Sequence, residues 1–213
     1  MPAPIYVALL HYPMTNRHGN VVTTAVTNLD IHDIARSCRT YDVRGYFLVT
    51  PLEVQHKLVG RILDHWQDEK SKQYHPYRYE ALSRVRLLKD FNEVKDRIRS
   101  ETGEDPEVVM TDARPFPNSV SYADYRSEIS QPKRKRPVCL VFGTGYGISE
   151  VFLPEVHRIL APVNGPEDAG GWEPPHEVHE KVGLEGTPVK RKGYNHLSVR
   201  SAVAIILDRL AGT

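Results

Sequence analysis

The sequence predicts a single α/β domain with a mostly parallel sheet of about six strands and helices on both faces. Two observations carry this prediction. Short apolar runs with the length of strands alternate with longer amphipathic segments, an order that produces a parallel sheet. The chain has 213 residues, of which 40% are apolar and 26% charged, enough to bury the core of one domain.

The first elements follow this alternation. Ile5–Leu10 is an apolar run typical of a strand, and residues 11–28 form a polar connection with turn-forming asparagine and glycine. Asn28–Val43 places apolar residues at helical spacing, with acidic residues in the first turn, where the helix dipole favours them. We expect Gly45 to stop this helix and Tyr46–Thr50 to form the second strand.

The rest of the chain repeats the pattern. Residues 67–79 are polar and rich in tyrosine, without a clear period. The other predicted elements are helices over 58–66, 91–102 and within 120–131, strands over 84–88, 107–111, 138–142 and 158–162, a short helix or turn over 148–156, and a C-terminal helix over 199–210.

A glycine-rich loop follows the most apolar strand, Val138–Phe142. Gly143, Gly145 and Gly147 alternate with Thr144 and Tyr146, so side chains are absent where a backbone turns sharply or approaches a ligand. The dinucleotide fingerprint fails because isoleucine follows at 148, and a phosphate loop lacks its lysine. The loop therefore indicates another kind of ligand site, or a tight turn without a ligand.

A polar segment precedes the C-terminal helix. Asn195, His196 and Ser198 stand at its N-terminal end, where Ser198 can cap the first turn. Polar groups at such a position can hydrogen-bond an adenosine.

These stretches carry a family resemblance. The glycine loop after a strand, the "ILAP" strand end and the "HLSVRSAVAIILDRL" helix resemble the second and third motifs of the SPOUT superfamily of S-adenosylmethionine (SAM)-dependent RNA methyltransferases. Thr111-Asp112-Ala113-Arg114 resembles the "TSAR" strand end of many SPOUT enzymes. From Ile5 to Leu210 the chain is similar to the small bacterial stand-alone SPOUT domains related to the tRNA guanine-N1 methyltransferases.

The resemblance implies a deep C-terminal trefoil knot that gathers one SAM pocket. It also implies a homodimer and an RNA substrate, with tRNA ahead of rRNA and either a guanine base nitrogen or a ribose 2'-oxygen as the methylated atom. The residues it assigns to the cofactor are Thr111, Gly143, Thr144, Gly145, Gly147, Leu160, Pro162, Asn195, His196, Leu197 and Ser198.

The segment 28–43 resembles the first motif of SpoU-type enzymes. Arg36, with Tyr41 and Val43 behind it, matches the arginine and the tail of that motif, while Asp30 takes the place of its asparagine and Asn28 lies two residues earlier. Arginine stays protonated, so Arg36 fits a substrate clamp, with a nearby carboxylate or imidazole as proton acceptor. The resemblance implies catalytic roles for Arg36, Asp30 and Asn28. The structural alternative for Arg36 is a surface ion pair with Asp33.

The remaining features indicate the environment of the protein. Two isolated cysteines, at 38 and 139, favour the core of a protein in a reducing compartment. The chain has no segment long and apolar enough to cross a membrane and no signal peptide at its start, so we expect a cytoplasmic protein. His176 and His179 lie in a proline-containing stretch without metal-site spacing, so we expect surface histidines and no metal.

The net charge of +1 neither favours nor excludes a nucleic-acid partner. The basic clusters that could bind one are the two runs 133–136 and 190–192. Residues 165–193, rich in glycine and proline, read as an insertion, either a lid or a surface loop. Two other functions stay open: a SPOUT-fold RNA-binding module without catalysis, and a nucleotide- or flavin-binding doubly wound protein.

Overall fold

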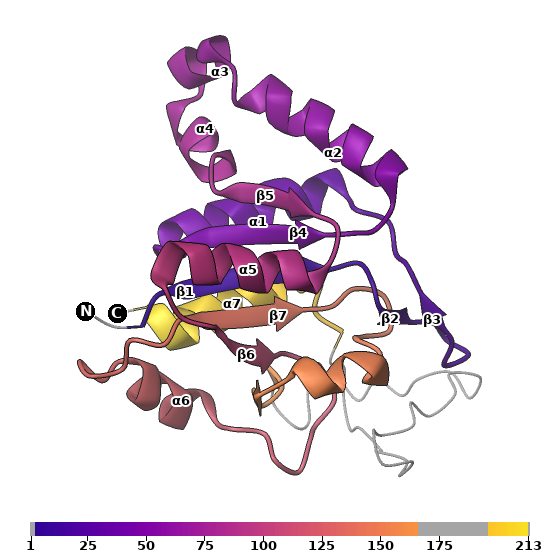
Figure 1. Cartoon of the computed structure of the whole chain (residues 1–213), viewed down its shortest axis with the longest axis vertical. Coiled ribbons are helices and arrows are strands. Elements are labelled where there is room, and N and C mark those ends of the chain that lie inside the picture. The colour runs from indigo at the N-terminus through magenta and orange to yellow at the C-terminus, as the bar shows by residue number, and fades with distance from the viewer. Residues whose placement is uncertain (1–2, 166–195, 213) are drawn as a thin grey trace.

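The computed structural model describes residues 3–165 and 196–212, and its centre is a six-stranded sheet (Figure 1). The strand order is β5-β4-β1-β7-β6-β8, and every neighbouring pair is parallel. The strands are β1 (Ile5–Leu10), β4 (Gly45–Val49), β5 (Val85–Leu88), β6 (Glu107–Met110), β7 (Val138–Phe142) and β8 (Arg158–Ile159). The predicted parallel sheet is therefore confirmed.

Helices cover both faces of this sheet, as the sequence predicts. One face carries α1 (Asn28–Thr40), α2 (Glu53–Trp66), α4 (Pro76–Leu82), α6 (Tyr122–Ile129) and α7 (Val199–Ala211), with the short α3 (Glu69–Tyr74) between α2 and α4. The other face carries α5 (Phe91–Thr102) and the 3-10 helix η1 (Glu150–Glu155). Figure 1 shows α5 in front of the sheet and α7 behind it.

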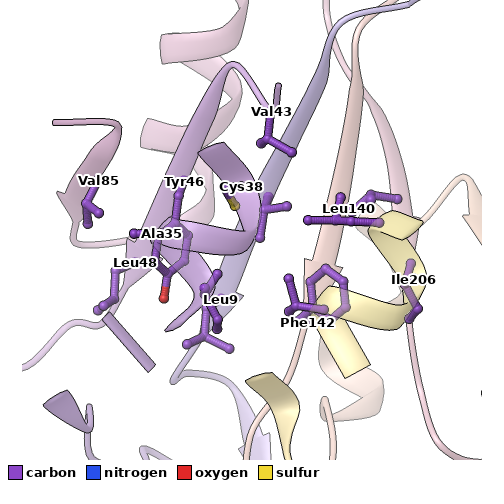
Figure 2. Packing of buried hydrophobic residues seen from close by; sticks show 14 of the residues in the cluster. Leu9, Ala35, Cys38, Val43, Tyr46, Leu48, Val85, Leu140, Phe142 and Ile206 are labelled. Carbon is purple, nitrogen blue, oxygen red and sulfur yellow. The ribbon is translucent and has the colours of Figure 1, made fainter. Parts of the chain in front are cut away.

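Two buried clusters hold these layers together. The larger lies under α1, α4, α6 and α7. Figure 2 shows Ala35 and Cys38 of α1 and Ile206 of α7 together with strand residues such as Leu9, Leu48 and Leu140. Cys38 and Cys139 are both fully buried, one in each cluster, as predicted. Burial raises the pKa of both thiols well above the usual value, so they are packing groups rather than nucleophiles.

Several boundaries and two elements differ from the predictions. Helix α1 ends at Thr40 rather than Val43, because Asp42 adopts a left-handed backbone and Val43 turns into the core; Gly45 then begins β4 instead of stopping the helix. The tyrosine-rich stretch forms α3, capped by Asp68, and α4, which starts at Pro76. Periodicity misses both helices because they have few turns.

The polar connection after β1 contains an unpredicted hairpin. Strand β2 (Met14–Thr15) pairs with β3 (Val21–Val22) in a separate antiparallel ribbon. Figure 1 shows this hairpin beyond the carboxyl ends of β1 and β4, next to the loop that follows β7. Its position makes it a neighbour of the glycine loop.

Residues 166–195 lie outside the described part, so the predicted insertion and its histidines remain predictions, as does the single-domain organisation. Among the described residues, no helix is both long and apolar enough to cross a bilayer.

Candidate active site

The topology marks one place in the sheet for a ligand. From β1 the chain moves outward to β4 and β5, and the later strands β7, β6 and β8 lie on the other side of β1. The strand order therefore reverses between β1 and β7. In open parallel sheets, ligands bind outside the carboxyl ends of the strands at such a switch point. The glycine loop begins at this point, directly after Phe142.

Each of the three positions in the loop requires glycine for a physical reason of its own. Gly145 and Gly147 have φ values of 61° and 103°, which favour glycine. A Cβ at Gly145 would lie 3.3 Å from the methyl group of Thr24, and one at Gly143 would lie 2.6 Å from the side chain of Ile148. The loop is a tight turn packed against its own surroundings, with little room for side chains.

The predicted strand ends meet beside this loop. Thr111, just after β6, donates its backbone N–H and its hydroxyl to the carbonyl of Val141 at 3.0 Å each. Leu160, just after β8, donates its backbone N–H to Met110 at 3.0 Å. The structure therefore brings Thr111, the glycine loop and Leu160 to one edge, with Pro162 two residues further along the chain. The Leu160 side chain itself is fully buried in the core cluster under this edge.

The turn after β6 packs under the glycine loop. Arg114 donates to both carboxylate oxygens of Asp112, at 2.9 and 2.7 Å, and both side chains are largely buried. A Cβ at Gly147 would lie 3.1 Å from the Asp112 carboxylate and 3.2 Å from the Arg114 guanidinium. The segment that resembles the "TSAR" strand end thus contacts the glycine loop.

A chain of hydrogen bonds links the end of β1 to the same loop. His11 is fully buried, and its Nδ1 lies 3.0 Å from the Thr24 hydroxyl, which lies 2.5 Å from the Thr144 hydroxyl. The Thr144 hydroxyl in turn donates to the carbonyl of Leu10 at 3.3 Å. All three contacts are satisfied at once when Thr24 donates to Thr144 and His11 donates through Nδ1, which leaves Nε2 as the bare acceptor.

Burial keeps this imidazole neutral. It lowers the pKa of His11 to about 4, against a smaller opposing effect of the Asp30 carboxylate. His11 Nε2 has no hydrogen-bond partner among the described residues. A neutral His11 agrees with hydrogen bonds donated from His11 to Thr24 and from Thr24 to Thr144.

Helix α7 begins on this edge as well. The Ser198 hydroxyl accepts from the Ser201 N–H, which confirms the predicted cap. Arg200, in the first turn, pairs with Asp30 at 2.9 Å and lies 3.5 Å from Asp33. These contacts join the N-terminal ends of α7 and α1, and they place His196, Leu197 and Ser198 beside α1. Asn195 lies outside the described residues.

The three predicted catalytic residues occupy different environments. Asp30 is buried and accepts from the Thr27 hydroxyl at 2.6 Å and from Arg200, whereas Asn28, the first residue of α1, is exposed. Arg36 is exposed, and within 3–165 and 196–212 its guanidinium has no hydrogen bond or ion pair. Among the described residues Asp33 pairs with Arg200, and the alternative ion pair between Arg36 and Asp33 is not formed.

The basic run 133–136 lies at the opposite, amino edge of the sheet. Arg134 pairs with the buried carboxylate of Glu107, the first residue of β6, and this carboxylate also accepts from the Tyr125 hydroxyl at 2.6 Å. Arg136 donates to the carbonyls of residues 105 and 106. Half of this run therefore has a structural role, remote from the switch point. The second basic run, 190–192, lies outside the described residues.

The functional arrangement includes residues that the motifs did not indicate. His11, Thr24 and Arg200 connect the predicted segments, and no sequence period distinguishes them. The one available signal was position, because polar residues just after a buried parallel strand gather at the ligand edge. In the described part of the chain, no group of three or more potential metal ligands occurs, and His176 and His179 fall outside it.

Comparison with solved structures shows which fold the chain adopts. A probable methylase family protein from Haemophilus influenzae has a TM-score of 0.57 at 16% identity, over 98% of this chain and 64% of that one. The SpoU methyltransferase AviRb from Streptomyces viridochromogenes has a TM-score of 0.54 at 14% identity, over 99% of this chain and 60% of that one. The fold is thus that of the SpoU-type methyltransferases.

Sequence comparison then gives the family. A family model described as "SAM-dependent RNA methyltransferase" matches residues 4–172 and 169–212. A protein from Aquifex aeolicus, named only "Uncharacterized protein", is 39% identical over 97% of this chain and 87% of its own length. The chain belongs to the SAM-dependent RNA methyltransferase family, and it is a SAM-dependent enzyme acting on RNA.

A second relative is longer. The "tRNA (guanine-N(1)-)-methyltransferase" of Nitratidesulfovibrio vulgaris is 38% identical over 98% of this chain but only 42% of that protein. The chain therefore spans less than half of this relative.

Proposed function

We propose that the carboxyl edge around β6, β7 and β8 is the SAM site, and that methyl transfer to RNA takes place between it and the N-terminal ends of α1 and α7. The observation that carries the proposal is the convergence of the glycine loop, Thr111 and Leu160 at the switch point of the sheet. The edge combines an apolar floor with backbone polar groups, which suits an adenosine.

The residues present fit this cofactor. Thr111, Gly143–Gly147, Leu160 and Pro162 would hold it from the strand ends, and His196–Ser198 from α7. The positive φ of Gly145 and Gly147 keeps side chains out of the loop, so that a ligand can approach its backbone. SAM supplies an electrophilic methyl group when bound. The work left to the protein is to orient the acceptor, exclude water and receive a proton.

For the acceptor we propose a division of roles along α1. Asp30 is held by Thr27 and Arg200, so it fits a role in fixing α7 against α1. Arg36, with an exposed guanidinium, remains suited to clamp an RNA phosphate. Asn28, at the exposed start of α1, remains available to contact the acceptor nucleotide.

We propose tRNA as the substrate, ahead of rRNA. The support is the name of the Nitratidesulfovibrio vulgaris relative. Because more than half of that protein lies outside the matched region, its name does not identify the nucleotide that this chain modifies. Asp30 in the place of the SpoU asparagine favours a guanine base nitrogen over a ribose oxygen.

We also propose the knot, the homodimer and a cytoplasmic location on the family resemblance. Packing of α7 against α1 and α6 on one face is compatible with a knotted C-terminus. Leu29 and Leu197, exposed by 58% and 45%, stand at the joined ends of α1 and α7 and supply an apolar contact for a second copy. Arg36 would then face the partner's site.

The test is methyl transfer from labelled SAM to RNA purified from a strain lacking the gene, followed by mass spectrometry of the nucleosides. We expect one methylated nucleotide, in the tRNA fraction. Cofactor binding without transfer to any RNA would instead favour the RNA-binding module, and copurified flavin or nucleotide the doubly wound alternative.

A further inference from the structure

The β2–β3 hairpin is the least explained part of the active-site edge. It interrupts the connection between β1 and α1, and it belongs to its own two-stranded sheet. Figure 1 shows it projecting past the carboxyl ends of the strands. An element that only closed the sheet would not need an exposed tip at this position.

The tip is polar and ordered. The Asn16 side chain accepts from the N–H groups of His18 and Asn20, at 2.8 and 3.0 Å, and Gly19 takes a left-handed φ of 81°. Arg17 and His18 are exposed, and Arg17 donates to the His18 ring at 2.9 Å. The turn therefore holds a cation and several hydrogen-bonding groups in a fixed arrangement, pointing into solvent.

The first 29 residues of the chain, which include the tip, carry a single charged side chain besides histidine. The sequence contains no aspartate or glutamate before Asp30, and Arg17 is the one lysine or arginine in that stretch. Two half-exposed aromatic rings flank the glycine loop next to it, Tyr12 at 47% and Tyr146 at 45%. An exposed cation beside exposed rings suits a phosphate chain with unstacked bases.

The base of the hairpin is bound to the glycine loop. Thr15 donates its N–H to Gly147 at 2.9 Å, and Ser149 donates to Pro13 at 3.1 Å. Met14 is fully buried and forms a bridge with Ile148. Together with the hydrogen bond between Thr24 and Thr144, these contacts fix the hairpin to the glycine loop through β2 and through the segment that follows β3.

We propose that the β2–β3 hairpin is an RNA-docking element whose tip contacts the substrate backbone through Arg17, and that its attachment to the glycine loop couples RNA binding to SAM binding. This inference rests on the proposed cofactor site. RNA bound at the tip holds the hairpin in place against the glycine loop, and SAM bound at the loop holds the loop in place against the hairpin. By linkage, each ligand then raises the affinity for the other by the same factor.

The first experiment measures binding of fluorescent RNA, purified in bulk from a strain lacking the gene, to the full chain. Arg17→Glu should weaken RNA binding at least about tenfold and raise KM for RNA, with SAM affinity and thermal stability unchanged, and Arg17→Ala should reduce the salt dependence by about one counterion. Lys135→Glu makes the same charge change at the opposite edge of the sheet and should have no effect. Equal RNA affinity of Arg17→Glu and the wild type would overturn the docking role.

The second experiment tests the attachment of the hairpin to the glycine loop separately from RNA binding at the tip. Thr24→Val keeps the side-chain shape but removes the hydroxyl that joins His11 to Thr144. We expect the mutual enhancement of SAM and RNA affinity, about fivefold or more in the wild type, to fall in this variant but not to vanish, because the contacts of β2 with the glycine loop remain. Undiminished coupling in this variant would overturn the attachment. Failure of Gly145→Val to weaken SAM binding would instead count against the cofactor site, so the two failures are distinguishable.

Discussion

The ion pair between Asp30 and Arg200 predicts unequal effects of removing its two partners. The Asp30 side chain is 5% exposed, whereas Arg200 is 29% exposed and has a second carboxylate, Asp33, at 3.5 Å. Arg200→Ala leaves a buried carboxylate with the Thr27 hydroxyl as its remaining partner. Asp30→Asn leaves a cation that still has Asp33 and water.

The expected costs follow from this asymmetry. Removing one partner of a buried pair costs about 3–5 kcal/mol, and the remaining Thr27 bond brings Arg200→Ala to about 3 kcal/mol of unfolding free energy. For a chain of this size that lowers Tm by about 6–12 °C. Asp30→Asn should cost about 1 kcal/mol.

Urea and thermal denaturation of both single variants and the double variant measure these costs. Arg200→Ala in the Asp30→Asn background should cost no more than about 1 kcal/mol, which gives a coupling of about 2 kcal/mol. Equal losses in the two single variants, or additive losses in the double variant, would refute the argument that burial of Asp30 decides the effect.

Four further predictions concern the site and the assembly. Gly145→Val should abolish SAM binding in calorimetry while the fold is kept, because a β-branched side chain at φ 61° meets Thr24; unchanged affinity would remove the loop from the cofactor site. Arg36→Ala should lower methyl transfer at least about a hundredfold with little change in SAM affinity, and near wild-type turnover would leave Arg36 as a surface charge. Since burial lowers the pKa of His11 to about 4, the unfolded chain binds the extra proton between pH 6.5 and 4. Stability should therefore fall by about 3 kcal/mol as the pH drops through that window, a slope that His11→Asn should lack in urea titrations at each pH. Light scattering should find a dimer at micromolar concentration, and a monomer would count against an active site completed by the partner.

Sequence reasoning succeeded where one local pattern decided the outcome. The apolar runs Ile5–Leu10 and Val138–Phe142 and the amphipathic helix Phe91–Thr102 match β1, β7 and α5 from end to end. It failed where contacts distant in sequence decided. Val43 continues the helical pattern, yet it leaves α1 for the core, and Arg84 donates to its carbonyl at 2.6 Å.

The residues of the candidate site also fall into those that a local pattern predicted and those that only distant contacts revealed. The glycine loop and the capped start of α7 were visible as motifs, because a turn needs glycine and a helix needs a cap wherever they occur. The linking residues were not visible. His11 is connected through Thr24 to Thr144, 133 positions later, only because β1 and β7 are neighbours in the sheet.

The sequence by itself determined the alternation of strands and helices, the glycine loop and the family motifs, because each depends on residues close together in the chain. The tertiary structure alone decided which of the polar groups meet. It tied the basic residues Arg134 and Arg136 to the amino edge, paired Arg200 with Asp30, and fixed the β2–β3 hairpin to the glycine loop. Strand order brings distant residues together at one edge, and strand order is not encoded in any local period.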